Sequence, residues 1–176
     1  MSSAPDLLDA PSLASPPRGW PRKAWAPVAR DRVGDIGAVL RLQRSSERGF
    51  YSDTSVLVRR GGRWIEEWAN GDRWPQRPDE PRPSDGSPIV MMTGTSGCSV
   101  GGGATHIAFT AGVVTTDAAR VRVASAIEEH DLDVDPRTGA FVALTVHGPD
   151  ATTFRIAVLG PDGREIDSME YRDPPP

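Results

Sequence analysis

A chain of 176 residues can bury one hydrophobic core, and its 38% hydrophobic and 25% charged residues are typical of a globular domain. Its net charge of −4 argues against nucleic acid as a partner, because phosphate binding needs a basic face. No stretch of about 18 apolar residues occurs, which argues against a membrane span.

The basic residues are almost all arginine, with Lys23 the one lysine, which indicates a bacterium with a GC-rich genome. Cys98 is the one cysteine, so no intramolecular disulfide can form. Residues 1–29 contain neither the basic start nor the apolar core of a signal peptide. We therefore expect a cytoplasmic protein.

Residues 1–27 are interrupted by prolines at positions 5, 11, 16, 17, 21 and 27. Proline disfavours the interior of a helix and cannot donate to a strand ladder, so we expect a tail that is disordered or docked. Trp20 and Trp25 favour docking of part of this tail on a surface, because a tryptophan side chain buries a large apolar area.

Residues 28–74 are predicted to form an N-terminal β-hairpin subdomain. Its turn is Gly61-Gly62, since two glycines accept the positive φ angles of a two-residue type I′ turn, and such a turn fixes the strand register. The predicted opposite pairs are Arg59 with Trp64, Val58 with Ile65 and Leu57 with Glu66. One face then carries Val56, Val58 and Ile65, and the other carries Leu57, Trp64 and Trp68 with Arg59. Apolar residues on both faces predict that both are covered.

Residues 75–87 form a predicted proline-rich linker, and residues 88–172 a predicted β-sandwich. The expected strands of the sandwich are 89–93, 106–114, 119–124, 129–134, 140–146, 153–159 and 164–171. Strand 140–146 is apolar almost throughout, so we expect it to be central and covered on both faces. The predicted fold class is all-β: an antiparallel β-sandwich, immunoglobulin-like in outline, with the N-terminal hairpin packed on it.

An acidic row follows one face of the expected strand 129–134 and consists of Glu129, Asp131, Asp133 and Asp135. In a hairpin with residues 119–124, Arg122 faces Asp131 and Arg120 faces Asp133, while the apolar residues between them share the other face. We interpret the row as a charge-paired solvent face, with a ligand- or calcium-binding module as the alternative. An EF-hand is excluded, because Pro136 stands where that loop needs glycine.

The sequence Gly97-Cys98-Ser99-Val100-Gly101 matches the G-x-S-x-G pattern of the nucleophile elbow in α/β-hydrolases. An elbow needs a helix after its serine, whereas glycines here lead into the expected strand 106–114. We interpret residues Gly94 to Gly103 as an interstrand loop, and a small hydrolase-type enzyme using Ser99 is the alternative.

No catalytic, metal or cofactor site is predicted. His106, His130 and His147 fall on separate expected strands without the spacing of metal ligands. The five tryptophans all precede residue 75 and stand among arginines, a combination found in protein-interface hot spots. The candidate partner-binding residues are Arg59, Trp64, Trp68 and Trp74. The alternative is that the tryptophans join the hairpin to the sandwich.

The resemblance of this chain to a known group of proteins rests on three local sequences: Gly62-Arg63-Trp64, Gly139-Ala140-Phe141-Val142 and Pro161-Asp162-Gly163-Arg164. Over residues 36–171 they make the chain resemble small uncharacterised β-rich proteins of GC-rich actinobacteria. This resemblance implies no activity and assigns no functional residue.

The sequence thus predicts a non-catalytic bacterial binding domain whose partner is another protein. The two alternatives are the hydrolase-type enzyme using Ser99 and the ligand- or calcium-binding module.

Overall fold

The computed structural model describes residues 8–9, 25–44, 50–74, 89–100, 102, 105–115, 117–136, 138–147 and 153–172. Side chains are described within these ranges except at positions 44, 50, 72–74, 89–99 and 147. The strands are β1 (Trp25–Val33), β2 (Ile36–Arg44), β3 (Phe50–Arg60), β4 (Arg63–Trp74), β5 (Ile89–Val100), β6 (Thr105–Val114), β7 (Arg120–Ser125), β8 (Glu129–Asp133), β9 (Ala140–His147), β10 (Thr153–Leu159) and β11 (Glu165–Arg172).

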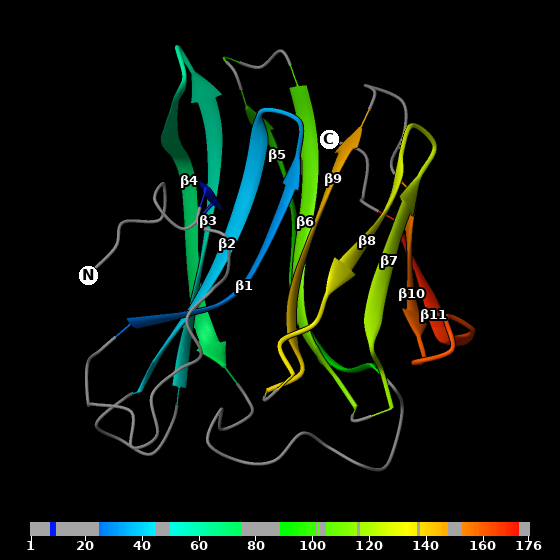
Figure 1. Ribbon diagram of the computed structural model, residues 1–176. Helices are drawn as coiled ribbons and strands as arrows, with labels where there is room; N and C mark the ends of the chain where they lie inside the picture. Colours follow the sequence, from blue (N-terminus) through cyan, green and yellow to red (C-terminus); the bar gives the residue numbers. More distant parts are fainter. Residues whose placement is uncertain are drawn as a thin grey trace.

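These strands form three antiparallel sheets that lie face to face (Figure 1). The first sheet has the order β1-β2-β3-β4, the middle sheet β5-β6-β9, and the last sheet β11-β10-β7-β8. The middle and last sheets make up the predicted antiparallel β-sandwich, and the all-β fold class is confirmed. The first sheet packs on the outside of this sandwich as a third layer.

Strand β9 shows why its sequence is apolar almost without a break. Ala140, Val142 and Leu144 belong to the core between the first and middle sheets. Phe141 and Ala143 point the other way and belong to the core between the middle and last sheets. Successive side chains of a strand point to opposite faces, so a strand covered on both faces needs apolar residues at every position. The predicted burial of both faces is confirmed, whereas the predicted central position is wrong: β9 is an edge strand of the middle sheet, and β6 is its central strand.

Two predicted hairpin registers are confirmed residue by residue. Gly61 and Gly62 have φ angles of 57° and 80°, and the turn they form pairs Arg59 with Trp64, Val58 with Ile65 and Leu57 with Glu66. In the last sheet, Arg122 pairs with Asp131 and Arg120 with Asp133. In both cases local sequence settles the pairing, either through the turn or through matching charges and apolar groups.

Strand β1 is an element that the proline pattern did not predict. It begins at Trp25, and Pro27 lies within it. The register with β2 shifts between Pro27 and Ala29, and β1 is an edge strand of its sheet. An edge strand with a bulge tolerates a residue that has no N–H to donate. Of the predicted tail, residues 8–9 and 25–27 are described, and the predicted linker lies outside the described residues.

Trp68 lies on the opposite face from the one predicted. A register shift between Val56 and Leu57 places Trp68 opposite Val56, so its side chain points toward the middle sheet. There its ring contacts Phe109 edge-on, with centroids 4.7 Å apart. One extra residue in a strand reverses the face of every residue beyond it, which is why strict alternation predicts the wrong face for Trp68.

The predicted interstrand loop at residues 94–103 is also wrong in most of its length. Strand β5 continues to Val100, and its last five residues pair with β6. Register shifts between Ile89 and Met91 and between Thr93 and Ser96 take up the extra residues. Glycine and serine favour loops, but pairing with the buried strand β6 satisfies their backbone groups in a sheet.

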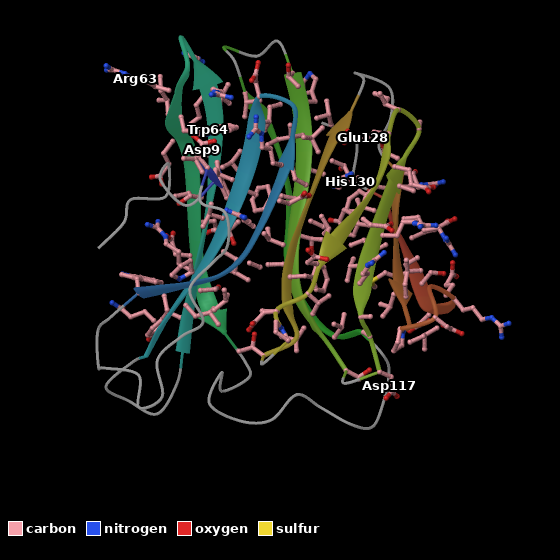
Figure 2. The ribbon with its side chains drawn as sticks, viewed as in Figure 1. Asp9, Arg63, Trp64, Asp117, Glu128 and His130 are labelled. Atoms are coloured by element: carbon pink, nitrogen blue, oxygen red, sulfur yellow. The ribbon has the colours of Figure 1, made fainter. Side chains whose placement is uncertain are left out.

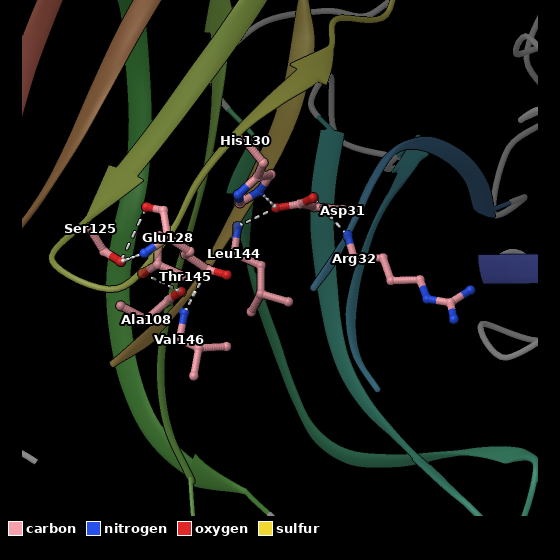
Figure 3. Close-up of polar contacts among 9 residues, drawn as sticks. All are labelled: Asp31, Arg32, Ala108, Ser125, Glu128, His130, Leu144, Thr145 and Val146. Carbon is pink, nitrogen blue, oxygen red and sulfur yellow. Dashed lines mark hydrogen bonds and ion pairs between the residues drawn. The ribbon is translucent and has the colours of Figure 1, made fainter. Parts of the chain in front are cut away.

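The outer edge of β9 is covered by side-chain carboxylates instead of another strand (Figure 3). Oδ2 of Asp31, in β1, accepts a hydrogen bond of 2.7 Å from the backbone N–H of Leu144. Oε1 of Glu128, in the turn between β7 and β8, accepts one of 2.8 Å from Val146. Unpaired N–H groups at a sheet edge invite pairing with other chains, and here acceptors from the neighbouring layers satisfy them.

Asp31 joins all three layers. Besides Leu144 in the middle sheet, Oδ2 contacts Nε2 of His130, in β8 of the last sheet, at 2.9 Å. Oδ1 accepts a bond of 2.7 Å from the N–H of Arg32, within β1 itself. The Asp31 side chain is only 4% exposed, so its charge is compensated by these donors and not by water.

We expect Asp31→Ala to lower the free energy of unfolding by about 3 kcal/mol, because it leaves the buried Leu144 N–H and the half-buried His130 ring without their acceptor. Urea denaturation followed by circular dichroism measures this. Asp117→Ala, at an exposed position (Figure 2), is the matched control and should change stability by less than about 0.5 kcal/mol. A loss below about 1 kcal/mol in Asp31→Ala would contradict the role assigned to the carboxylate.

Candidate functional site

The outer face of the first sheet, which points away from the middle sheet, carries an apolar group from three strands. Val39 of β2, Leu57 of β3 and Trp64 of β4 form one cluster. Val39 and Leu57 are fully buried, and Trp64 is 7% exposed. No other sheet covers this face among the described elements, so its burial depends on another part of the chain.

Leu8 provides part of that cover. Its side chain belongs to the same cluster and is 6% exposed. It lies directly over Gly37 of β2, where an added Cβ would come within 2.6 Å of Cδ1 of Leu8. Any side chain at position 37 would therefore displace the leucine. The absence of a side chain at Gly37 creates the hollow that Leu8 fills.

Two guanidinium groups flank the tryptophan of this face. Cζ of Arg32 lies 5.1 Å from the centre of the Trp64 ring, and Cζ of Arg59 lies 5.8 Å from it. Both distances are within the range of cation–π contacts. Nη1 of Arg32 is also 3.7 Å from Oδ1 of Asp9, which Figure 2 shows beside Trp64. We call the surface made by these residues the Trp64 patch: Arg32, Gly37, Val39, Leu57, Arg59 and Trp64.

The Trp64 patch retains hydrogen-bonding and charge capacity. Nε1 of Trp64 is buried, and none of the described residues accepts a hydrogen bond from it. Buried indole N–H groups usually have an acceptor. Arg59 forms no ion pair with any described residue. Among the described residues, the patch therefore combines an apolar cluster with a buried N–H that has no acceptor and a guanidinium that has no carboxylate partner.

The four candidate partner-binding residues separate in the structure. Arg59 and Trp64 lie together in the patch, as the predicted register requires. Trp68 packs between the first and middle sheets, which agrees with the alternative that tryptophans join the two parts. The backbone of Trp74 ends β4 opposite Phe50, and its side chain lies outside the description.

Sequence reasoning missed the contributions of Leu8, Asp9, Arg32 and Gly37. One signal was available: Leu7-Leu8 is an apolar pair between two aspartates in a segment otherwise rich in proline and small residues. Such an isolated apolar pair indicates a docking segment. Its docking position, however, depends on contacts between residues far apart in the chain, which no local pattern contains.

The acidic row lies on a charge-paired face, as predicted. Nε and Nη2 of Arg122 donate to the two carboxylate oxygens of Asp131 at 2.6 and 3.1 Å. Hydrogen bonding to Arg122 lowers the pKa of Asp131. Asp135 accepts instead from the backbone and hydroxyl of Thr138 in the next turn. Among the described residues, no group of three or more His, Cys, Asp or Glu side chains is arranged to bind a metal ion.

Ser99 lies on a regular strand and not on a nucleophile elbow. It pairs with His106 across β5 and β6, and His106 pairs in turn with His147 across β6 and β9. The three residues thus form one row across the middle sheet, with Cys98 opposite Ile107 in the adjacent row. The segment that follows β5 leads into strand β6, whereas an elbow leads into a helix.

The contact between Asp31 and His130 has the residue types of a catalytic dyad but not its surroundings. A catalytic pair needs the second ring nitrogen of histidine to face a nucleophile or substrate. Nδ1 of His130 is buried, and no described residue is within hydrogen-bonding distance of it. The hydrogen bond to Asp31 raises the pKa of His130, against the lowering effect of burial. The pair therefore serves to connect layers.

Comparison of the chain with protein-family models gives no match, and comparisons with curated proteins and with solved structures give none either. Within the described ranges, no helix is long and apolar enough to cross a membrane.

We expect the contribution of His130 to stability to decline as the pH rises from about 6.5 through its raised pKa. A histidine whose pKa is higher in the folded than in the unfolded state stabilises the fold fully only below the unfolded value. Asp31 acts most strongly on it, and Glu128 and Asp131 also favour its charged form.

The measurement compares wild type with His130→Gln in urea denaturation at pH 5.5 to 8.5. Both proteins contain histidines 106 and 147, so the contribution of these residues to the pH dependence cancels in the difference. The difference in unfolding free energy should shrink with increasing pH. A difference that stays constant or grows over this range would show that His130 is not stabilised as a cation.

Proposed function

We propose that this chain is a non-catalytic protein-interaction domain, and that its Trp64 patch binds a short segment of a partner protein. The observation that carries the proposal is that the patch already receives a short peptide segment, the Leu8–Asp9 pair of the same chain. A surface that binds one aliphatic side chain and one carboxylate in this way can bind others of the same kind.

The residue types of the patch support a protein partner. Tryptophan and arginine are enriched among the residues that dominate binding energy in protein interfaces, and they act best when surrounding groups exclude water. Trp64 is 7% exposed, between the guanidinium groups of Arg32 and Arg59 and the aliphatic side chains of Val39 and Leu57. A partner segment would thus find a buried anchor and a charged rim.

The scaffold supports the same proposal. The patch stands on β1 to β4, a sheet whose opposite face is anchored in the core. Binding residues on a packed sheet keep their positions without loss of conformational freedom on binding, which favours affinity. Arg59 and Trp64 are opposite one another beside a two-residue turn, so their spacing is fixed by the backbone.

The test is capture of partners from native cell extract on immobilised protein, with quantitative mass spectrometry of the eluate. We expect at least one protein that wild type retains to be lost by about tenfold or more on Arg59→Glu, because a reversed charge at the rim opposes an acidic segment.

Arg164→Glu is the matched control, since this arginine side chain is 89% exposed and lies in the turn between β10 and β11. It should retain the partner as wild type does. If every retained protein is retained equally by both variants, the patch is not the partner-binding surface, and the proposal fails.

A further inference from the structure

We propose that Leu8 and Asp9 act as an internal pseudo-ligand of the Trp64 patch, and that the partner segment has the same chemistry: an aliphatic side chain followed by a carboxylate. This inference rests on the function proposed above and adds the class of ligand and the means of regulation. In the free chain the patch is occupied in cis, and a partner binds by replacing Leu8 and Asp9.

The fit of Leu8 defines the aliphatic part of the ligand. Its two methyl carbons lie 2.6 and 2.8 Å from the point where a Cβ of Gly37 would stand. The branched aliphatic side chain of Leu8 therefore occupies the space that a side chain at position 37 would need. Val39, Leu57 and Trp64 enclose the same side chain.

The ion pair between Asp9 and Arg32 defines the acidic part. Its atoms are 3.7 Å apart, and the two side chains are 52% and 43% exposed. An ion pair exposed to this degree contributes little to affinity, but it specifies which end of the segment lies over β1. The carboxylate must follow the aliphatic residue directly, as Asp9 follows Leu8.

The cis segment leaves part of the patch unused, which allows a partner to replace it. Arg59 has no carboxylate partner among the described residues, and Nε1 of Trp64 has no acceptor there. A segment with a second acidic group can satisfy both in addition to the contacts of Leu8 and Asp9. Covalent attachment gives the cis segment a high effective concentration, so displacement requires these extra contacts.

The experiment uses the full chain with Leu8→Ala and Asp9→Ala together, which opens the patch and leaves its residues intact. The probe is a fluorescein-labelled synthetic peptide with the sequence of residues 2–14, and binding is measured by fluorescence anisotropy. We expect the double variant to bind this peptide at least about tenfold more tightly than wild type, in which the cis segment competes. A peptide with the same two alanine replacements should bind neither protein.

Gly37→Val, added to the double variant, is the blocking control. Its side chain occupies the hollow, so peptide binding should be lost while the β-sheet signal in circular dichroism is unchanged. Should this variant fold poorly, Arg32→Asp in the double variant provides the second test. It should weaken the binding of the normal peptide and recover it for a peptide whose aspartate is replaced by arginine.

Equal affinity of wild type and double variant, or no binding by either at millimolar peptide, would overturn the pseudo-ligand. Either result leaves the capture experiment with Arg59→Glu unaffected, so the two proposals can fail separately. Dimers of wild type that disappear on Leu8→Ala, seen by light scattering, would place Leu8 on a second copy and also overturn occupation in cis.

Discussion

The carboxylate of Asp31 stands where the three sheets meet, and the relative placement of the layers depends on it. A buried carboxylate is stable only with donors around it, and these come from β1, from β9 and from His130 in β8. Two of these donors are backbone N–H groups, and the third is a side chain of the last sheet. Sliding of the first sheet on the sandwich would separate the Asp31 carboxylate from the donors of the other two sheets and leave its charge uncompensated. Apolar packing holds the sheets together but is not directional, whereas these hydrogen bonds specify one relative position of the sheets.

The same strand carries part of the proposed binding surface, the Trp64 patch. Residues 31 and 32 are neighbours in β1, and successive side chains of a strand point to opposite faces. Asp31 consequently points inward to the other layers, while Arg32 points outward to Trp64 and Asp9. The turn that follows, with Gly34 at a φ of 58°, fixes the pairing of Val33 with Ile36. The hydrogen bonds of Asp31 therefore anchor the strand that carries Arg32, the next residue, at the edge of the Trp64 patch.

The sequence predicts this fold wherever a local feature specifies the pairing. Gly61-Gly62 determines which residue faces Trp64, and the agreement of charges with apolar groups determines that Arg122 faces Asp131. The sequence predicts the fold poorly wherever contacts with distant parts of the chain outweigh the local preference of the residues. Pro27 suggests an end to regular structure, yet an edge position and a bulge accommodate it. Three of the six residues of the Trp64 patch, Leu57, Arg59 and Trp64, follow from the hairpin register, while the contact between Leu8 and Gly37 joins sequence positions that no periodicity connects.

One sheet edge and one sheet face of this molecule are shielded by a few side chains and not by a further strand or sheet. Strand β9 would offer free N–H groups to any passing strand, and the carboxylates of Asp31 and Glu128 occupy them. The outer face of the first sheet would expose Val39, Leu57 and Trp64, and Leu8 provides part of their cover. The two covers differ in strength: buried carboxylates bound by several donors are costly to remove, whereas one leucine and a solvent-exposed ion pair are not. The contacts of Leu8 and Asp9 can be broken at low cost, and they lie on a surface with apolar, aromatic and cationic groups. Both properties support the proposal that the Trp64 patch is closed in the free protein and opened by a partner.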